Sequence, residues 1–245
     1  MLDFLKNHPF PVAAHFTQST VLTFAVPKAQ LQSFLPESIS LDTFNDEFGF
    51  IAVAMVDTKN LRPKGFPEFM GNNFFLIGYR IFVKYVDNRG KRLRGLYIIK
   101  SETNKKKMEF FGNIFTHYNY TTTDISFAEK GNLAEISSEK SGFKLIFEEK
   151  EDAVLPETSP FENWKQARRF AGPLPFTFTY EETKKQMLII QGVRQNWTPK
   201  AITVIDQHFD FIEKLNLKGV KLANAFVIKN VPYHWEKGKK ELWKP

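Results

Sequence analysis

The fold is decided by the stretch from Tyr79 to Tyr120, which reads YRIFVKYVDNRGKRLRGLYIIKSETNKKKMEFFGNIFTHYNY. Two apolar segments flank the residues DNRG at 87–90, and these residues suit a tight turn, so the pattern predicts a β-hairpin over 74–85 and 95–100. A polar, lysine-containing segment follows. The aromatic run from Phe110 to Tyr120 is then expected to form a third strand.

Further short strands are expected on both sides of this hairpin. Apolar and β-branched runs between turn-like residues predict them at 20–26, 48–56, 124–127, 134–136, 143–147, 174–180, 187–194 and 223–228. The segment 201–215 begins as a strand and ends as a helix. Short helices are expected after Pro27 and after Ser159, where a capping serine precedes a proline.

About ten strands with two or three short helices indicate an α+β fold that is predominantly antiparallel β. We expect a closed or cone-like β-barrel or double sheet, and residues 1–245 are interpreted as a single domain because no linker or repeat divides them. The 26 phenylalanines among 245 residues imply either a thick core or a cavity lined with aromatic side chains.

Several classes of chemistry are excluded by what the sequence lacks. The chain has no cysteine, which excludes disulfides and cysteine nucleophiles. It contains no glycine-rich phosphate loop, no His-Glu-x-x-His and no Gly-x-Ser-x-Gly. The five histidines are scattered, so we expect neither a metal site nor a cofactor.

The expected location and partners follow from charge and hydropathy. No apolar run approaches the roughly 20 residues of a membrane helix, and Asp3 and Lys6 interrupt the start of the chain, so a cytoplasmic location is expected. The net charge of +7 is concentrated in the apparent turns 89–94 and 105–107 and in the tail 237–244. Such charges are usually solvated, so we expect no nucleic-acid or membrane partner. An anionic partner at these basic turns is kept as an alternative, and an oligomer is left open.

Two arginines are candidate ligand-binding residues. On a strand, Arg80 points away from its neighbours Tyr79 and Ile81, and an arginine inside a barrel needs a carboxylate partner or an anionic ligand. If that face is exposed to solvent instead, Arg80 is an ordinary surface residue. Arg194, with Trp197 nearby, raises the same question at another strand end.

Two further segments are candidate parts of a site. If 110–120 is a strand, His117 and Tyr118 lie on opposite faces, and either face offers hydrogen bonds to a small ligand. The segment Asp57–Asn73 is long for a passive loop, and it is interpreted either as a lid that carries aromatic residues over a cavity or as outer packing.

The order of these features resembles the acetoacetate decarboxylase-like superfamily, and within it a widespread bacterial branch of unknown function. The resemblance is carried by VLTFAVPKAQLQSFLPESISLD, GYRIFVKY, GLYIIKSE, EFFGNIFTHYNY, RRFAGPLPFTFTY and VPYHWEKG, which together span nearly the whole chain. It implies a single acetoacetate decarboxylase-like domain over 1–245.

The resemblance also identifies a departure at the catalytic motif. In the decarboxylases, Glu-x-x-Gly-x-Pro-Lys-Lys supplies a lysine that forms a Schiff base with the β-keto acid. Here Glu109 and Gly112 match the motif, whereas Phe115 and Thr116 stand where the two lysines would be. Neither residue can form an imine, so decarboxylation of the family type is not expected at this position.

We therefore expect the chain to bind a small organic ligand, anionic or keto-acid-like, in an aromatic-lined pocket; whether it is an enzyme stays open. Glu109 and His117 are the candidate proton-handling residues. The candidate ligand-binding residues are Arg80, Lys100, Phe115, Thr116, Tyr118, Arg194 and Trp197. The alternatives are a Schiff-base lyase or decarboxylase that uses a relocated lysine, Lys100, and a non-enzymatic binder of an anionic partner through the basic turns.

Overall fold

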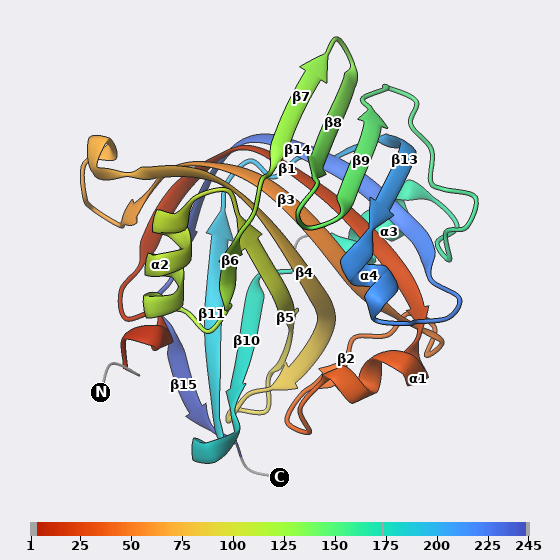
Figure 1. Ribbon diagram of the computed structural model, residues 1–245. Helices are drawn as coiled ribbons and strands as arrows, with labels where there is room; N and C mark the ends of the chain where they lie inside the picture. Colours follow the sequence, from red (N-terminus) through yellow and green to blue (C-terminus); the bar gives the residue numbers. More distant parts are fainter. Residues whose placement is uncertain (1–3, 173, 244–245) are drawn as a thin grey trace.

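A computed structural model describes residues 4–172 and 174–243 and shows a ring of seven strands beside a smaller sheet (Figure 1). The ring runs in the order β14, β1, β3, β4, β5, β10 and β11, and it closes because β11 also pairs with β14. These strands are Lys221–Trp235, Val12–Pro27, Phe48–Pro63, Asn72–Val86, Arg92–Thr103, Phe176–Glu181 and Gln186–Arg194. All their pairings are antiparallel except that of β5 with β10.

Four shorter strands extend the ring and four others form the second sheet. The extensions are β2 (Ser40–Leu41), β6 (Tyr120–Thr122), β12 (Lys200–Ala201) and β15 (Lys239–Leu242). The second sheet has the order β13, β9, β8, β7 and comprises Thr203–Phe209, Phe143–Glu148, Leu133–Ser138 and Ser126–Lys130. The predicted α+β class with a mainly antiparallel sheet is thus confirmed, although the strands are longer and more numerous than expected.

The helices are short. They are α1 (Lys28–Leu31), α2 (Lys106–Phe115), α3 (Trp164–Ala171) and α4 (Asp210–Lys214), with 3-10 turns at Leu5–Asn7, Gln32–Phe34, Glu68–Met70 and Glu182–Lys184. No helix in the described part of the chain is long and apolar enough to cross a membrane.

The two faces of the ring sheet have separate roles. On one face, side chains such as Leu22, Val53 and Ile77 form the largest core cluster with Ile136 and Leu145 of the second sheet. The opposite face points into the ring. Because successive residues of a strand alternate between faces, this arrangement fixes which residues line the interior.

The prediction of a strand over 110–120 is wrong. This segment contains α2, and only Tyr120 enters a strand, after Asn119 has turned the backbone into the left-handed region at a φ of 50°. Apolar residues at 110, 111, 114 and 115 follow the helical spacing i, i+1, i+4, i+5. The aromatic content favoured a strand, but the spacing was that of a helix.

The start of α3 also differs from the prediction. The Ser159 side chain accepts a hydrogen bond from the Phe161 backbone N–H, but the helix begins only at Trp164. Its N-cap is Asn163, whose side-chain oxygen accepts a hydrogen bond from the Gln166 backbone N–H.

The exposed middle of the segment 57–73 does not cover a cavity, although Leu61, Arg62, Pro63 and Asn72 line the larger of the two cavities described next. Its first residues, through Pro63, belong to β3, its last two belong to β4, and residues 64–71 form the projecting connection at the upper left of Figure 1. Phe66, Phe69 and Met70 are 50%, 87% and 52% exposed, and they line neither of the two cavities described next.

Candidate functional site

A cavity of about 130 Å³ lies inside the ring, and we call it the ring cavity. Every strand of the ring contributes to its lining, as do the end of α3 and the residues Tyr118 and Tyr120 that follow α2. The lining is mainly apolar. Its polar side chains are Ser19, Arg80, Ser101, Thr177, Arg194 and three tyrosines, and the described residues that line it include no aspartate, glutamate or lysine.

Arg80 reaches the cavity because of strand alternation on β4. Leu76, Arg80 and Phe82 line the cavity, whereas Ile77, Tyr79 and Ile81 belong to the core cluster on the other face. Gly78 gives the arginine room: a Cβ at this position would lie 3.0 Å from Arg80 Nε. The predicted orientation of Arg80, away from Tyr79 and Ile81, is the one observed.

Arg80 is a half-buried cation with no partner among the described residues. No described residue forms an ion pair or hydrogen bond with it, and its Nε is completely buried. A buried donor without an acceptor costs about 1–3 kcal/mol. An anion in the cavity would supply the missing acceptor.

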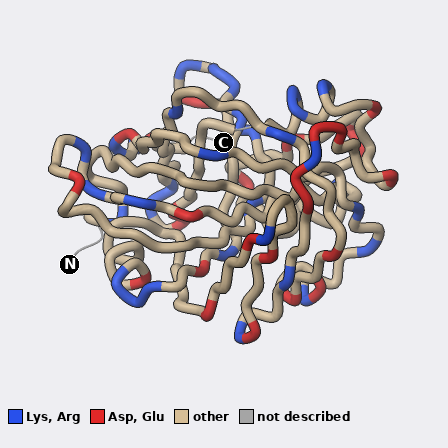
Figure 2. The backbone as a smooth tube through the Cα atoms, turned by 90° about the horizontal axis from the view of Figure 1, so that it is seen from above, with Lys and Arg blue, Asp and Glu red and all other residues tan. Residues whose placement is uncertain are grey.

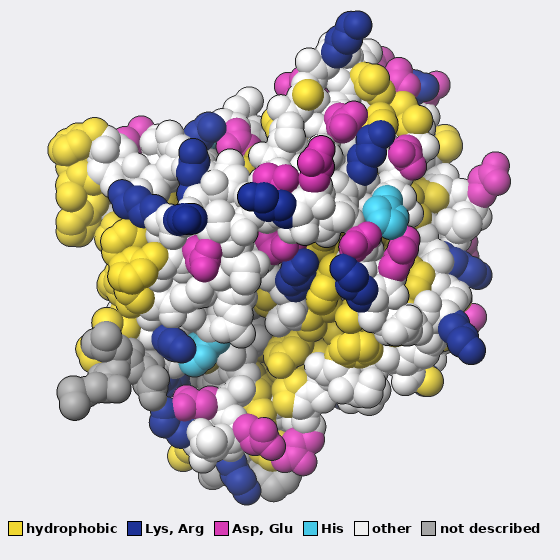
Figure 3. Space-filling model, in the orientation of Figure 1, with side chains coloured by type: hydrophobic (Ala, Val, Ile, Leu, Met, Phe, Trp, Pro, Cys, Tyr) yellow, Lys and Arg dark blue, Asp and Glu magenta, His cyan; other side chains and the backbone are white. Residues whose placement is uncertain are grey.

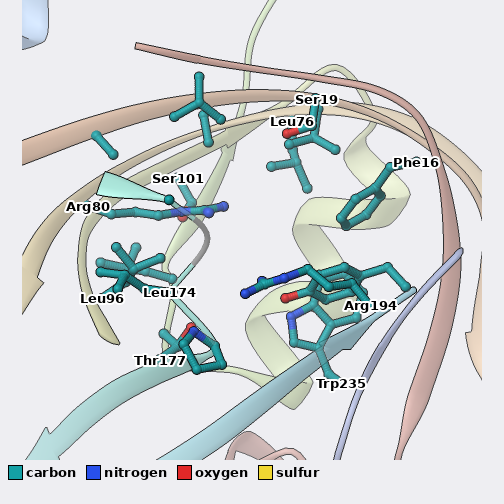
Figure 4. Close-up of a pocket in the computed structure, with 18 of the residues that line it drawn as sticks. Phe16, Ser19, Leu76, Arg80, Leu96, Ser101, Leu174, Thr177, Arg194 and Trp235 are labelled. Carbon is teal, nitrogen blue, oxygen red and sulfur yellow. The ribbon is translucent and has the colours of Figure 1, made fainter. Parts of the chain in front are cut away.

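Arg194 approaches the cavity from the opposite wall, and Figure 4 shows the two guanidinium groups pointing toward the same space. The register of β11 and β14 places Arg194 across from Tyr233, and the two side chains are hydrogen-bonded. Gly192 makes this possible, because a Cβ there would collide with the Tyr233 hydroxyl. The Arg194 guanidinium also lies 4.7 Å from the ring centre of Trp197.

Trp197 supplies a second buried donor without an acceptor. Its Nε1 is inaccessible to solvent and makes no hydrogen bond. Together with Arg80 Nε, it gives the cavity wall two N–H donors without acceptors, and none of the described lining residues is a carboxylate that could accept from them. The cavity is thus complementary to a hydrogen-bond acceptor that carries negative charge.

The three tyrosines of the cavity are neutral at physiological pH. Burial raises the pKa of Tyr118 and of Tyr233 above the usual value, and it raises the pKa of Tyr120 to about 12, against the opposing effect of the Arg80 charge. Tyr118 is also hydrogen-bonded with Thr177. Neutral phenols donate hydrogen bonds, so these groups can bind a carbonyl or carboxylate oxygen beside the arginines.

Burial also lowers the pKa of the Arg194 guanidinium, and the hydrogen bond and negative character of Tyr233 act in the opposite direction. This change has the sign expected for a cation held in an apolar wall. An anionic ligand would offset part of the free-energy cost of burying the Arg194 guanidinium.

A second, larger cavity of about 370 Å³ lies between α2 and the ring, and we call it the α2 groove. Phe115 and Thr116 line it, so both residues predicted at the position of the catalytic lysines face this groove and not the ring cavity. Tyr118 lines both spaces.

Glu109 and His117, the predicted proton-handling residues, line neither cavity. Because 110–115 is helical, Glu109 points elsewhere and accepts a hydrogen bond from the Thr122 hydroxyl. His117 Nε2 lies 3.4 Å from Asn7 Oδ1. The structure therefore does not bring these two side chains together with the arginines.

Lys100 also lies outside both cavities. It is on the same face of the sheet as its partner Tyr79, where its Nζ is 3.0 Å from Glu102 Oε1 and 5.0 Å from the ring centre of Phe211. Glu102 is 4% exposed and also accepts a hydrogen bond from Ser141. The lysine therefore neutralises a buried carboxylate on the face opposite the ring cavity.

The basic turn 89–94 meets the end of α3. Lys91, Arg92 and Arg94 line a shallow cleft of about 270 Å³ together with Arg168 and Arg169. Seen from above, basic residues are interspersed with acidic ones over much of the chain (Figure 2). The described residues contain no group of three or more histidine, aspartate or glutamate side chains arranged to hold a metal ion.

Tyr233, Gly78 and Gly192 were not identified by the sequence patterns, although they shape the cavity. Tyr233 lies 39 positions after Arg194 in the chain. Its contact exists only because β11 and β14 close the ring. The position of Gly78, two residues before Arg80, could have indicated its role, because residues two apart on a strand lie on the same face and a glycine there leaves room for the arginine.

Comparison with known proteins gives a family and a fold. The profile of the family DUF2071, described as "Uncharacterized conserved protein", matches residues 13–234. No curated protein matches the sequence.

Several solved structures share the fold at low sequence identity. Acetoacetate decarboxylase from Legionella pneumophila has a TM-score of 0.63 at 9% identity, over 95% of this chain and 88% of that one. An acetoacetate decarboxylase-like enzyme from Sphingomonas wittichii RW1 has a TM-score of 0.58 at 9% identity, over 97% and 94%. The enduracididine biosynthesis enzyme MppR, in complex with pyruvate, has a TM-score of 0.56 at 9% identity, over 95% and 90%. The chain therefore has the acetoacetate decarboxylase-like fold that the resemblance implied.

Proposed function

Since the chain belongs to the DUF2071 family and has the acetoacetate decarboxylase-like fold, we propose that its ring cavity binds a small organic carboxylate, such as a short-chain oxo acid. The observation that carries the proposal is Arg80, a half-buried cation that no described residue pairs with, which faces Arg194 across a cavity lined by no described carboxylate. A buried charge is stable only when it is paired, and an anionic ligand is the partner that the cavity lacks.

The size and polarity of the cavity favour such a ligand. A closed apolar cavity of about 150 Å³ holds a benzene-sized molecule, so the 130 Å³ of the ring cavity suits a short oxo acid. The carboxylate would accept hydrogen bonds from the arginines. The keto oxygen would accept them from the neutral phenols of Tyr118 and Tyr120. The complex of MppR with pyruvate shows that one protein with this fold binds an oxo acid.

The proposal is for binding without Schiff-base decarboxylation. An imine requires a lysine at the ligand, and none of the described residues that line the ring cavity is a lysine. The cavity instead offers positive charge and neutral hydrogen-bond donors, which bind and polarise a carbonyl group.

Calorimetric titration with matched ligands tests the proposal. Pyruvate and acetoacetate should bind, whereas pyruvamide, which is similar in size but neutral, should not. Arg80→Met and Arg194→Met should each weaken binding strongly. Arg89→Met, which removes an exposed arginine from the β4–β5 turn, should not. Equal binding of the acid and the amide would refute the proposal.

Borohydride trapping distinguishes the Schiff-base alternative at Lys100 from the proposed binding without an imine. Borohydride treatment in the presence of acetoacetate should leave the intact mass unchanged, because Lys100 faces away from the ring cavity and is paired with Glu102. A trapped adduct on Lys100 would favour this alternative over simple binding.

The other alternative is an anionic partner at the basic turns. It is favoured by one observation, the convergence of the turn 91–94 with Arg168 and Arg169. Such binding would weaken steeply with added salt, and a charge-reversal pair, Arg168→Glu with Arg169→Glu, would abolish it. Because these residues lie outside the ring cavity, the same variant should bind pyruvate normally.

A further inference from the structure

The α2 groove extends the candidate site with an apolar compartment. Its volume of about 370 Å³ is nearly three times that of the ring cavity. Its walls are mostly aromatic and aliphatic, contributed by Phe10, Val12, Leu61, Phe74, Phe111 and Phe115. In Figure 3, hydrophobic side chains reach the surface over α2 and over the adjacent connection from β3 to β4. The groove is therefore an apolar space that remains open to the outside.

The groove and the ring cavity adjoin at a shared layer of side chains. Leu76, Tyr118, Tyr120 and Trp235 line both spaces. A ligand that contacts both sides of this layer therefore has to span only the thickness of one side chain. The arginines lie on one side of it and the phenylalanines of α2 on the other.

The polar groups of the groove do not oppose an anionic ligand. None of the described residues that line it is an aspartate or glutamate. His8, only 6% exposed, lines the groove, and its Nδ1 is buried without a hydrogen-bond partner. Lys107 also lines it, and Arg62 does so while bonded to Glu68 and to backbone carbonyls.

We propose that the ring cavity and the α2 groove together bind a carboxylic acid with an apolar tail. The carboxylate lies between Arg80 and Arg194, and the tail passes the shared layer and lies against Phe111 and Phe115 in the groove. The acid end of this ligand rests on the proposed function, whereas the tail rests on the groove alone. Combined, the two spaces reach the size of cavities that bind ligands of several hundred daltons.

In this arrangement the polar contacts recognise the acid group and the apolar contacts recognise the tail. Arg80 and the Trp197 N–H select for the acid group, because each is a buried donor that lacks an acceptor among the described residues. The groove selects for tail length, because each buried methylene is removed from water. The two contributions can therefore be measured independently.

A series of unbranched monocarboxylates tests the proposal, with lengths from acetate to dodecanoate and concentrations below the micellar range. Trp235 lines both spaces, so its fluorescence provides a signal alongside calorimetry. Affinity should rise about fourfold for each added methylene once the tail enters the groove, and should level off when the groove is full. Arg80→Met should weaken every member of the series by a similar factor.

Groove-filling variants locate the tail. Leu61→Trp and Met108→Trp, on different elements that line the groove, should flatten the dependence on chain length and leave the affinity for the shortest acids unchanged. Leu133→Trp is the matched control, since Leu133 is 42% exposed on β8 and lines neither cavity. Thermal unfolding of each variant shows whether it is folded.

The outcomes separate this inference from the proposed function. If short acids bind through Arg80 but affinity is independent of chain length, the tail proposal is overturned and the proposed function stands. If long acids bind and Arg80→Met has no effect, the acid end is wrong and both fail. If the groove is instead the contact with a second copy of the chain, sedimentation will show a dimer that Leu61→Trp disrupts, and this too overturns the tail proposal.

Discussion

Replacing Arg80 by methionine should raise the stability of the unliganded protein while it abolishes tight binding of the acid. The guanidinium has no described partner, and its Nε is a buried donor without an acceptor. An unsatisfied buried donor costs about 1–3 kcal/mol, and because the side chain is only half-buried we expect a gain near the lower limit, about 1 kcal/mol. In a chain of this size 1 kcal/mol shifts Tm by about 2–4 °C.

The effect on binding has the opposite sign. A hydrogen bond to a charged group contributes about 1.5–3 kcal/mol, so losing Arg80 should weaken the complex by about 10- to 150-fold. Methionine keeps much of the side-chain length without the charge, so the loss reports on the cation itself. Calorimetric titration with pyruvate or acetoacetate measures it.

Arg94→Met is the matched comparison. Arg94 lies on β5, the strand next to Arg80, but its Nε is 2.6 Å from Asp42 Oδ2 and it also donates to the Phe170 carbonyl. Asp42 is 3% exposed and keeps only Lys84 in the variant. Since Arg94 is itself 37% exposed, we expect a loss of about 1–3 kcal/mol, measured by urea unfolding. If both variants lose stability equally and both bind pyruvate normally, the reasoning about Arg80 is refuted.

Three further predictions follow from the same structure. Gly78→Ala should weaken acid binding by part of the Arg80→Met effect while the protein stays folded, because the new Cβ would displace Arg80 Nε; unchanged affinity in a calorimetric titration would contradict this. Lys100→Met should leave acid binding unchanged but lower stability by about 1–3 kcal/mol, because it removes the cation beside the buried Glu102; urea unfolding measures the loss, and weaker acid binding would place Lys100 in the site after all. Stability should fall as pH rises from about 10 toward 12, because the unfolded chain releases the Tyr120 proton near pH 10 while the native pKa is about 12; absorbance at 295 nm should then rise together with the loss of circular dichroism, and free ionisation of the phenols in the folded protein would be the contrary result.

The strands were accessible from the sequence because their signal is local. The hairpin of β4 and β5 follows from two apolar segments around a tight turn, and the same alternation correctly assigned Arg80 to the face opposite Tyr79. The inference that an arginine inside the ring would need a carboxylate partner or an anionic ligand required no coordinates. These conclusions depend on side-chain periodicity and burial, which neighbouring residues determine.

The errors arose where a local pattern fits two structures. Phe110, Phe111, Ile114 and Phe115 are strand-like in composition and helical in spacing, and packing of α2 beside β5 and β6 selects the helix. Glu109 and His117 were assigned to the site on the assumption of a strand, so the helix also removed them from it. Lys100 is a candidate imine former from its position at the end of an apolar strand. The irregular register of β4 and β5 near Tyr79, however, places it on the face of the sheet opposite the ring cavity.

By itself, the sequence determined a mainly antiparallel β protein of the acetoacetate decarboxylase-like fold, and it placed Arg80 on the strand face opposite Tyr79. Only the tertiary structure decided which residues share the cavity. Arg80, Arg194 and Tyr233 belong to three strands, and they meet because β11 pairs with β14 and closes the ring. Alternation along one strand is a local property of the chain, whereas ring closure depends on pairing between distant segments.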